Sequence, residues 1–218
     1  MSNYEPLAET LRPNVLNNFV GQRHLLEPDR PIGKTLKNGQ LHSMILWGPS
    51  GTGKTTLARI MCNQVGAHFE QMSAVLGGVK ELRVVLDHAK RYQRQNKNTI
   101  LFVDEIHRFN KSQQDAFLPH IESGLVTLIG ATTENPSFEI NSSLLSRLSV
   151  YILKPLNDEE LSVIASKALE YQSAKLEDKE SLARIIDASS GDARRLINII
   201  EQLTQTSKKI LNKKDVTK

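Results

Sequence analysis

One run of residues has the composition and spacing of a loop that binds phosphate groups: Gly48, Pro49, Ser50, Gly51, Thr52, Gly53, Lys54 and Thr55. Glycines let the backbone curl so that successive N–H groups point at one anion. An apolar segment precedes the run and a helical pattern follows it, which is the context that such a loop needs. In that context Lys54 is expected to reach the β- and γ-phosphates of ATP, and the Thr55 hydroxyl to bind Mg²⁺.

Two adjacent acids follow a second apolar segment, at Asp104 and Glu105. We expect Asp104 to hold Mg²⁺ and Glu105 to polarise the attacking water as a general base. With His107, these acids also spell the Asp-Glu-x-His form of one helicase superfamily. Such helicases need a second recombinase-like domain and further motifs, and 218 residues leave no room for them. The pair therefore favours nucleotide hydrolysis over that class of helicase.

Three further residues are candidates because of their positions in the expected elements. Thr133 ends an apolar segment and could set a hydroxyl between the γ-phosphate and the water, with Thr132 as the second choice. Arg147 follows a short helical stretch and could reach a neighbouring subunit's γ-phosphate. Arg194 lies in the first turn of an expected helix, where the helix dipole disfavours a cation. Taken singly, these residues are equally typical of strand ends and salt-bridged surfaces.

Apolar runs and helical periods alternate along the first part of the chain, which indicates an α/β fold with a parallel sheet. A proline at 119 interrupts one helical stripe, so we expect a local distortion there. From about residue 155 the patterns are helical only, and Asn157 with Glu160 looks like a capping box. Strands are expected at 44–47, 68–72, 99–103 and 126–131, and helices after 54, at 82–89, at 117–121, after 157, at 179–189 and after Asp192.

The patterns divide the chain into a nucleotide-binding α/β domain at 1–154 and a small helical lid domain at 155–218. Hydrophobic residues make up 39% of the chain and charged residues 24%, and the formal net charge is +4. This basic excess permits an anionic partner such as nucleic acid without establishing one. Candidate DNA contacts lie on one expected helix, and a solvated face explains them equally well: Lys80, Arg83, Lys90, Arg91 and Arg94.

Other site classes find little support in the sequence. The single cysteine, Cys62, excludes an internal disulfide, fits a reducing compartment and is expected in the core. No His-x-x-x-His or Cys-x-x-Cys pair suggests zinc. The apolar runs are strand-sized and the first residues do not resemble a secretory signal, so we expect a cytoplasmic protein with no membrane partner.

These motifs, in this order, resemble an AAA+ ATPase, and the whole set is most similar to the RarA/MgsA family of replication-associated recombination proteins, relatives of Werner-helicase-interacting protein. The most distinctive run, at 102–115, separates this family from clamp-loader subunits and from the branch-migration motor RuvB. The resemblance rests on the segments 7–13, 19–26, 48–55, 73–75 with 78–80, 102–115, 131–138 and 191–195. Ser50 departs from relatives that often have proline there, at a variable position of the loop.

The resemblance implies a role for each matched residue. Thr133 corresponds to sensor 1, Arg147 to the arginine finger and Arg194 to sensor 2 in the lid. The backbone around Val20 and Gly21 would line the adenine pocket. Family members continue into a helical C-terminal region that assembles the protein, typically as a tetramer. This chain is therefore expected to lack that region, and its own assembly state and turnover stay open.

The function implied by the resemblance is DNA-dependent ATP hydrolysis in replication-fork maintenance, recombination and repair. The expected partners are forked or single-stranded DNA, replication proteins and further copies of the chain, in a bacterial, nucleoid-associated setting. One alternative is a clamp-loader or RuvB-like branch-migration ATPase of the same fold. An alternative of another class is a nucleotide-dependent adaptor that binds ATP without hydrolysing it, and the acid at Glu105 argues against it.

Overall fold

The computed structural model describes residues 4–75, 78–206 and 210–211 of the chain. Its contacts divide the chain into two compact units. The sheet unit comprises residues 14–48 and 54–153, and the helical unit comprises residues 1–13, 49–53 and 154–218. The central part of the phosphate loop thus belongs to the helical unit, which the sequence patterns did not indicate. The division into domains at 1–154 and 155–218 stays a prediction.

The sheet unit is built on one five-stranded sheet in the order β2-β3-β4-β1-β5, and every neighbouring pair is parallel. This confirms the predicted α/β fold with a parallel sheet. The strand β5 was not predicted, although Val150, Tyr151 and Ile152 form a short apolar run; the strand lies at the sheet edge and its residues are mostly exposed. The strands are β1 (Met44–Trp47), β2 (His68–Ser73), β3 (Thr99–Asp104), β4 (Thr127–Thr132) and β5 (Ser149–Ile152).

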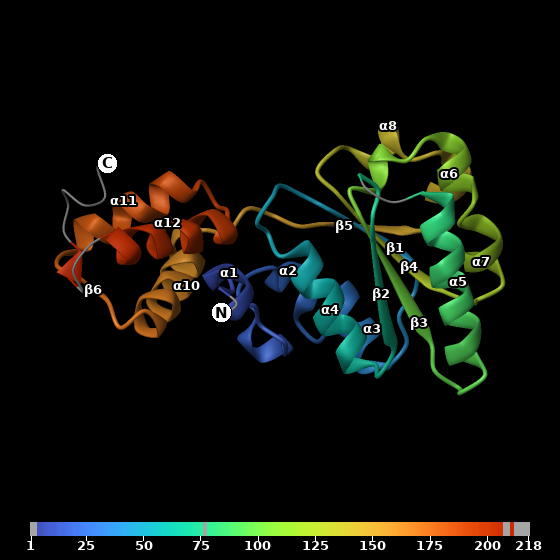
Figure 1. The fold of residues 1–218 in the computed structure, drawn as a ribbon, viewed down its shortest axis with the longest axis horizontal. Coiled ribbons are helices and arrows are strands. Elements are labelled where there is room, and N and C mark those ends of the chain that lie inside the picture. The colour runs from blue at the N-terminus through green and yellow to red at the C-terminus, as the bar shows by residue number, and fades with distance from the viewer. Residues whose placement is uncertain (1–3, 76–77, 207–209, 212–218) are drawn as a thin grey trace. The chain divides into compact units, whose positions relative to one another are not determined.

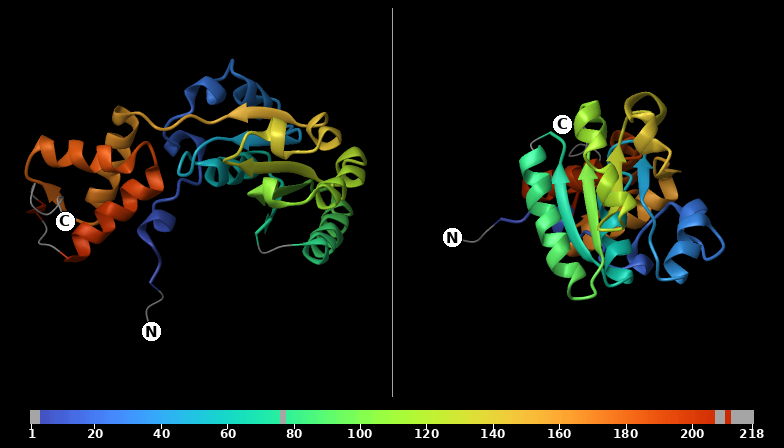
Figure 2. Two further views of the ribbon diagram at one scale, coloured as in Figure 1. Left: turned by 90° about the horizontal axis from the view of Figure 1, so that it is seen from above. Right: turned by 90° about the vertical axis from the view of Figure 1, so that its right-hand side faces the viewer.

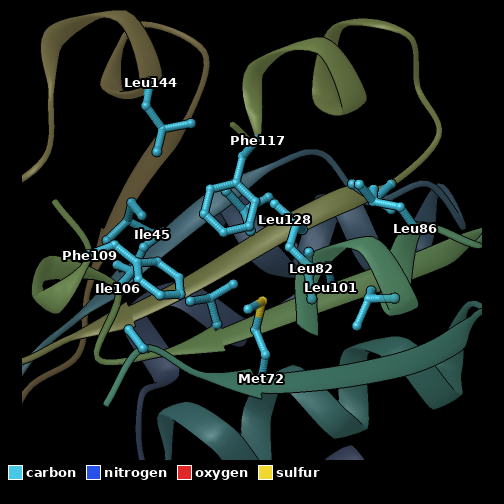
Figure 3. Packing of buried hydrophobic residues seen from close by; sticks show 14 of the residues in the cluster. Ile45, Met72, Leu82, Leu86, Leu101, Ile106, Phe109, Phe117, Leu128 and Leu144 are labelled. Carbon is cyan, nitrogen blue, oxygen red and sulfur yellow. The ribbon is translucent and has the colours of Figure 1, made fainter. Parts of the chain in front are cut away.

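Helices cover both faces of the sheet, as Figures 1 and 2 show. In β3, Ile100 and Phe102 pack into one apolar cluster while Leu101 and Val103 pack into the other, as strand alternation requires. The first cluster is covered by α2 (Arg23–Leu26), α3 (Pro31–Lys37) and α4 (Lys54–Gln64), and the second by α5 (Val79–Gln93) and α7 (Leu118–Glu122). The short helix α6 (Lys111–Asp115) precedes α7. Figure 3 shows Phe109 and Phe117 within the second cluster.

The proline at 119 has a different effect from the predicted kink. The chain forms two short helices, α6 and α7, and Pro119 lies in the first turn of α7. Proline is tolerated there because the first turn has no N–H partner to lose. The expectation of one distorted helix was wrong: the helical pattern is interrupted before the proline, not at it.

The helical unit packs three long helices around its own core, at α10 (Asp158–Tyr171), α11 (Lys179–Ser189) and α12 (Ala193–Thr206). The predicted capping box is confirmed, since Asn157 accepts from the Glu160 N–H and Glu160 reaches back to the Asn157 N–H. The short helix α1 (Leu7–Thr10) joins this core through Leu7. Two-residue strands β6 (Lys175–Leu176) and β7 (Ile210–Leu211) also pair here, where only helices were expected.

The buried carboxylate of Glu201 on α12 holds the N-terminal segment to this unit. It accepts hydrogen bonds from the Tyr4 hydroxyl at 2.7 Å and from the Leu7 N–H at 2.9 Å. The carboxylate raises the pKa of Tyr4, because a phenolate beside it would be disfavoured. Residues at opposite ends of the chain are thereby joined.

Cys62 on α4 is fully buried, as expected, and burial raises the pKa of its thiol to about 11. It is therefore a core side chain rather than a reactive nucleophile. No helix in the described part of the chain is long and apolar enough to cross a membrane.

Gly130 in β4 allows the turn after β3 to pack directly on the sheet. This turn is the 3₁₀ helix η2 (Ile106–Arg108), and its Ile106 is fully buried. A methyl group on Gly130 would lie 2.6 Å from Ile45 Cδ1 and 3.0 Å from Ile106 Cδ1. The missing side chain therefore makes room for the residue that follows Glu105.

Replacing Gly130 by Ala should lower the free energy of unfolding by about 1–3 kcal/mol, because close-packed isoleucines would have to move. Gly78→Ala is the matched control, since its added methyl group meets no atom within 4 Å and its φ of −156° suits any residue. Urea denaturation followed by circular dichroism measures the free energy of unfolding of both variants. Equal losses in the two variants would contradict the packing role of Gly130.

Candidate active site

The carboxyl ends of the five parallel strands meet at one edge of the sheet. Trp47 of β1 pairs with Thr132 of β4, and Ser73 of β2 pairs with Asp104 of β3. On the other side of β1, Ile152 of β5 pairs with Trp47. In parallel α/β sheets, ligands bind outside this edge. Of the residues predicted to act on a nucleotide in the sheet unit, Asp104, Glu105 and Thr133 lie at or just beyond this edge, whereas Arg147 precedes β5.

The two ends of the phosphate loop belong to the sheet unit. Lys54 opens α4 and is 8% exposed, and its Nζ donates a hydrogen bond to the Gly48 carbonyl at 2.7 Å. A Cβ at Gly48 would lie 2.3 Å from the Leu153 carbonyl oxygen. Only glycine fits where the chain leaves β1, which explains the first residue of the motif. Thr55 follows in the first turn of α4 and is partly exposed.

The middle of the loop belongs to the helical unit, where it contacts the start of α12. The Ala193 N–H donates to the Gly51 carbonyl at 3.2 Å. Gly51 and Gly53 have φ of +68° and +92°, values that favour glycine. The Thr52 hydroxyl donates to the Pro49 carbonyl at 2.9 Å and braces the loop. Pro49 and Ser50 are exposed. This hydrogen-bonded contact joins the loop to the helix that carries Arg194.

Asp192 makes glycine necessary at position 51. A Cβ on Gly51 would lie 1.8 Å from Asp192 Oδ1. The same oxygen accepts the Arg195 N–H at 2.9 Å, so Asp192 caps α12 as predicted and has little freedom to move.

The two predicted acids lie where the sequence indicated, at the end of β3. Asp104 is its last residue, and Glu105 has φ of +53° in the left-handed region. A non-glycine residue there costs about 1–3 kcal/mol, and such strain gathers at functional sites. Both side chains are partly exposed. Among the described residues, no group of three or more His, Cys, Asp or Glu could hold a metal ion.

A histidine that we did not predict as a site residue contacts one of these acids. His107 Nδ1 lies 3.2 Å from Glu105 Oε2 and 2.8 Å from the Thr132 hydroxyl oxygen. Thr132 is fully buried and also accepts the Glu134 N–H at 3.0 Å. The Asp-Glu-x-His motif already marked this histidine in the sequence, but the motif does not indicate a contact with Thr132.

Thr133 lies immediately beyond β4 and is partly exposed. Thr132, the second choice for the same role, points its hydroxyl into the protein, toward His107 and Glu134. The two threonines therefore differ in what they can reach, and Thr133 is the one left at the surface of this edge.

Arg147 follows the short helix α9 (Ser142–Leu145) and is exposed. Its guanidinium lies 2.6 Å from Glu122 Oε1, and it donates to the Ser143 carbonyl at 2.7 Å. Both partners belong to the sheet unit. The predicted arginine finger is thus held on its own subunit by an exposed ion pair.

Arg194 lies in the first turn of α12 and its side chain is exposed. The turn before it is tight, with φ of +52° at Ser190 and +80° at Gly191. A Cβ on Gly191 would lie 2.7 Å from Pro155 Cβ. The backbone before α12 is therefore closely constrained within the helical unit.

The segment predicted to line an adenine pocket, Val20 and Gly21, precedes α2 in the sheet unit. Gly21 and Gln22 both have positive φ, at +89° and +56°. His24 Nε2 lies 2.9 Å from the Ile152 carbonyl oxygen at the carboxyl end of β5. This contact holds the segment against the edge at which the strands end.

The basic residues predicted as DNA contacts are exposed along α5 and at its C-terminal end: Lys80, Arg83, Lys90, Arg91 and Arg94. Lys90 lies 3.4 Å from Asp87, so part of this charge is balanced on the helix itself. Their contact with DNA stays a prediction.

A family model described as the ATPase family associated with various cellular activities (AAA) matches residues 44–156. This range is more than half of the chain and holds both the phosphate loop and the two acids. The chain belongs to the AAA family. The predicted fold, a P-loop core of this family with helices after it, is confirmed.

Within the AAA family, the chain is similar to replication-associated recombination protein A. It is 52% identical over 206 residues to that protein from Coxiella burnetii and 50% identical over 207 residues to the one from Escherichia coli K12. Both alignments cover 92% of this chain and 46% of the relative, so the chain spans less than half of their length. ATPase WRNIP1 of Dictyostelium discoideum is 42% identical over 210 residues, 94% of this chain and 24% of the relative. The predicted resemblance is confirmed.

Among solved structures, the chain is similar to RuvB from Thermotoga maritima. One point mutant of RuvB has a TM-score of 0.77 at 26% identity, covering 95% of this chain and 71% of the RuvB chain. A structure described as the RuvB Holliday junction branch migration motor has a TM-score of 0.75 at 27% identity with the same coverage. The arrangement of elements is shared with RuvB, while the sequence is much more similar to the recombination protein.

The contact between Gly51 and Asp192 can be tested by a double-mutant cycle. Gly51→Ala should lower the free energy of unfolding, because its methyl group meets a fixed carboxylate. We expect the loss caused by Gly51→Ala to be about 1 kcal/mol smaller when Asp192 is already alanine. Thermal and urea unfolding of the four proteins measures this coupling. Additive losses would contradict the contact.

Proposed function

We propose that this chain is the nucleotide-hydrolysing part of a DNA-dependent AAA ATPase that acts in replication-fork maintenance, recombination and repair. The observation that carries the proposal is the meeting of Lys54, Asp104, Glu105 and Thr133 at the carboxyl edge of the sheet. The 52% identity to replication-associated recombination protein A supports the biological role. The activity and partners of the whole protein are part of the proposal.

ATP binding is assigned to residues 48–55, with Val20 and Gly21 on the adenine side. Lys54 has three donors, and the bond to the Gly48 carbonyl uses one of them. With ATP bound, the ammonium group would donate to the β- and γ-phosphates. The glycine-rich backbone and the start of α4 supply N–H groups for the remaining phosphate oxygens.

Mg²⁺ would be held by the hydroxyl of Thr55 and the carboxylate of Asp104. Both offer oxygen ligands, and Mg²⁺ takes only one or two protein ligands beside phosphates and water. The lack of a larger acidic or histidine cluster among the described residues fits this requirement. When bound, the ion neutralises charge on the phosphates.

The water is assigned to Glu105 and Thr133. Glu105 is a partly exposed carboxylate just beyond β3, where it can accept a proton as the water attacks in line. Thr133 is the better partner than Thr132, because the Thr132 hydroxyl is buried and hydrogen-bonded within the protein. Arg194 from the helical unit would stabilise charge on the γ-phosphate.

Arg147 is assigned to a neighbouring subunit's nucleotide. Its ion pair with Glu122 is exposed, and exposed pairs contribute only about 0–1 kcal/mol. Exchange of Glu122 for a phosphate therefore costs little. A pair of this kind can keep the arginine folded back on its own subunit until a neighbour's phosphate replaces it. The complete protein is accordingly proposed to be a homo-oligomer.

Replacing Glu105 by Gln should lower ATP turnover at least about 10²-fold, because the amide cannot accept the proton. Affinity for a fluorescent ATP analogue should change less than about threefold, since Glu105 does not hold the phosphates. Steady-state phosphate release and equilibrium titration measure the two. A non-hydrolysing adaptor predicts equal, negligible turnover in both proteins and would replace this proposal.

The oligomer and the DNA can be tested together in the complete protein. Forked DNA should raise ATP turnover, and the Arg147→Ala variant alone should lose most of its ATP turnover. An equal mixture of Arg147→Ala and Glu105→Gln subunits should regain activity at about a quarter of the sites, where an intact base faces an intact arginine. Lys37→Ala, an exposed change on α3, is the control.

No gain in the mixture would contradict a shared site, and no effect of DNA would contradict the fork role. The rival function, a clamp-loader or branch-migration ATPase, is favoured by the RuvB fold similarity. It predicts stimulation by a sliding clamp or by a four-way junction with its binding partner rather than by forked DNA.

A further inference from the structure

His107 joins the end of β3 to the end of β4 at the candidate site. Its Nδ1 atom lies 3.2 Å from Glu105 Oε2 and 2.8 Å from Thr132 Oγ1. The histidine side chain is only 11% exposed, and Glu105 is 29% exposed. One nitrogen thus lies against both the proposed general base and a fully buried strand-end hydroxyl.

The surrounding hydrogen bonds assign the proton to Nδ1. The Thr132 oxygen accepts the Glu134 N–H at 3.0 Å, and its own hydroxyl can donate to the Glu134 carbonyl at 3.3 Å. Nδ1–H then donates to the Thr132 oxygen, which accepts two N–H groups and keeps its own proton for the Glu134 carbonyl. The opposite tautomer would turn a nitrogen lone pair toward the Glu105 carboxylate, which is repulsive. With the proton on Nδ1, the same group attracts that carboxylate.

The backbone fixes the histidine in this position. Glu105 has φ of +53°, and Ile106 is fully buried against the sheet beside Gly130. The Arg108 N–H donates to the Glu105 carbonyl at 2.9 Å and closes the turn. His107 is therefore carried by a closed turn with an anchored neighbour, and its ring has a fixed partner in Thr132.

We propose that His107 is a positioning residue for Glu105. It holds the carboxylate beside the end of β4, and so sets where the general base stands relative to Thr133, the next residue after Thr132. This inference rests on the proposed ATPase function and on Glu105 as the base. It assigns no proton transfer to His107, because the Nδ1 proton is already shared within the turn.

The test compares single-turnover and steady-state ATP hydrolysis by the assembled native protein without DNA. His107→Leu removes the donor with little change in size, and His107→Asn returns an amide N–H near the Nδ1 position. We expect His107→Leu to lower kcat about tenfold or more, with KM and nucleotide Kd changed less than about threefold. His107→Asn should recover most of the loss. Arg108→Ala, an exposed neighbour on η2, should leave basal kcat unchanged.

A second comparison places the effect on Glu105. Adding His107→Leu to Glu105→Gln should lower kcat no further, because residues that act as one unit are not additive. Thr132→Val, which removes the hydroxyl that fixes the ring, should produce a smaller loss of kcat than His107→Leu.

Wild-type kcat in His107→Leu would overturn the inference. It would also fail if His107→Asn were no better than His107→Leu, or if nucleotide affinity and melting temperature fell together with kcat, since either result describes a purely structural residue. If Glu105→Gln itself kept full turnover, the proposed catalytic function would fail instead. The two failures are therefore distinguishable in one set of proteins.

Discussion

The parallel register of β1, β4 and β3 sets the places of Asp104, Glu105 and Thr133. Backbone pairing brings Trp47 level with Thr132 and Val103 level with Gly130, so the strands end at one edge. The chain then needs only one or two residues beyond each strand to supply a side chain with chemistry. Asp104, Glu105 and Thr133 all follow this rule, and Lys54 follows at the end of the loop after β1, although long stretches of sequence separate the strands.

Three residues at the ends of strands or the starts of helices have backbone conformations that most residues avoid. Glu105 adopts a left-handed φ directly after β3, Gln22 does so before α2, and Ser190 does so before α12. Each costs about 1–3 kcal/mol, and such a cost persists only where the surroundings over-determine it. At Glu105 the surroundings are identifiable: Ile106 is buried beside Gly130, which has no side chain to exclude it. The core next to the edge thus stabilises the geometry of the edge.

The sequence predicted what depends on local pattern, and missed what depends on contacts between distant segments. Four strands and the capping box at Asn157 follow from apolar periods and short polar signals, because their causes lie within a few residues. The edge strand β5 was missed although Val150, Tyr151 and Ile152 are apolar, and its residues are mostly exposed. The break between α6 and α7 precedes Pro119, which instead lies in the first turn of α7. The contacts of Glu201 with Tyr4, and of Gly51 with Asp192, join parts of the chain that no pattern relates.

The run at 102–115 has a structural task beside its proposed catalytic one. It begins in β3, passes Glu105 and His107, and includes Gln114, which is 2% exposed. The Gln114 amide donates to the Phe109 and Glu139 carbonyls at 2.9 and 3.0 Å, and its oxygen accepts the Asn141 N–H at 2.8 Å.

Asn141 in turn caps α9 by accepting the Leu144 N–H at 2.7 Å, and Arg147 follows that helix. Buried polar networks of this kind are rigid when every member is satisfied. The segment that bears the proposed base is therefore joined, through Gln114 and Asn141, to the segment that bears the proposed finger. The side chains of this run thus connect two segments of the sheet unit through hydrogen bonds of their own.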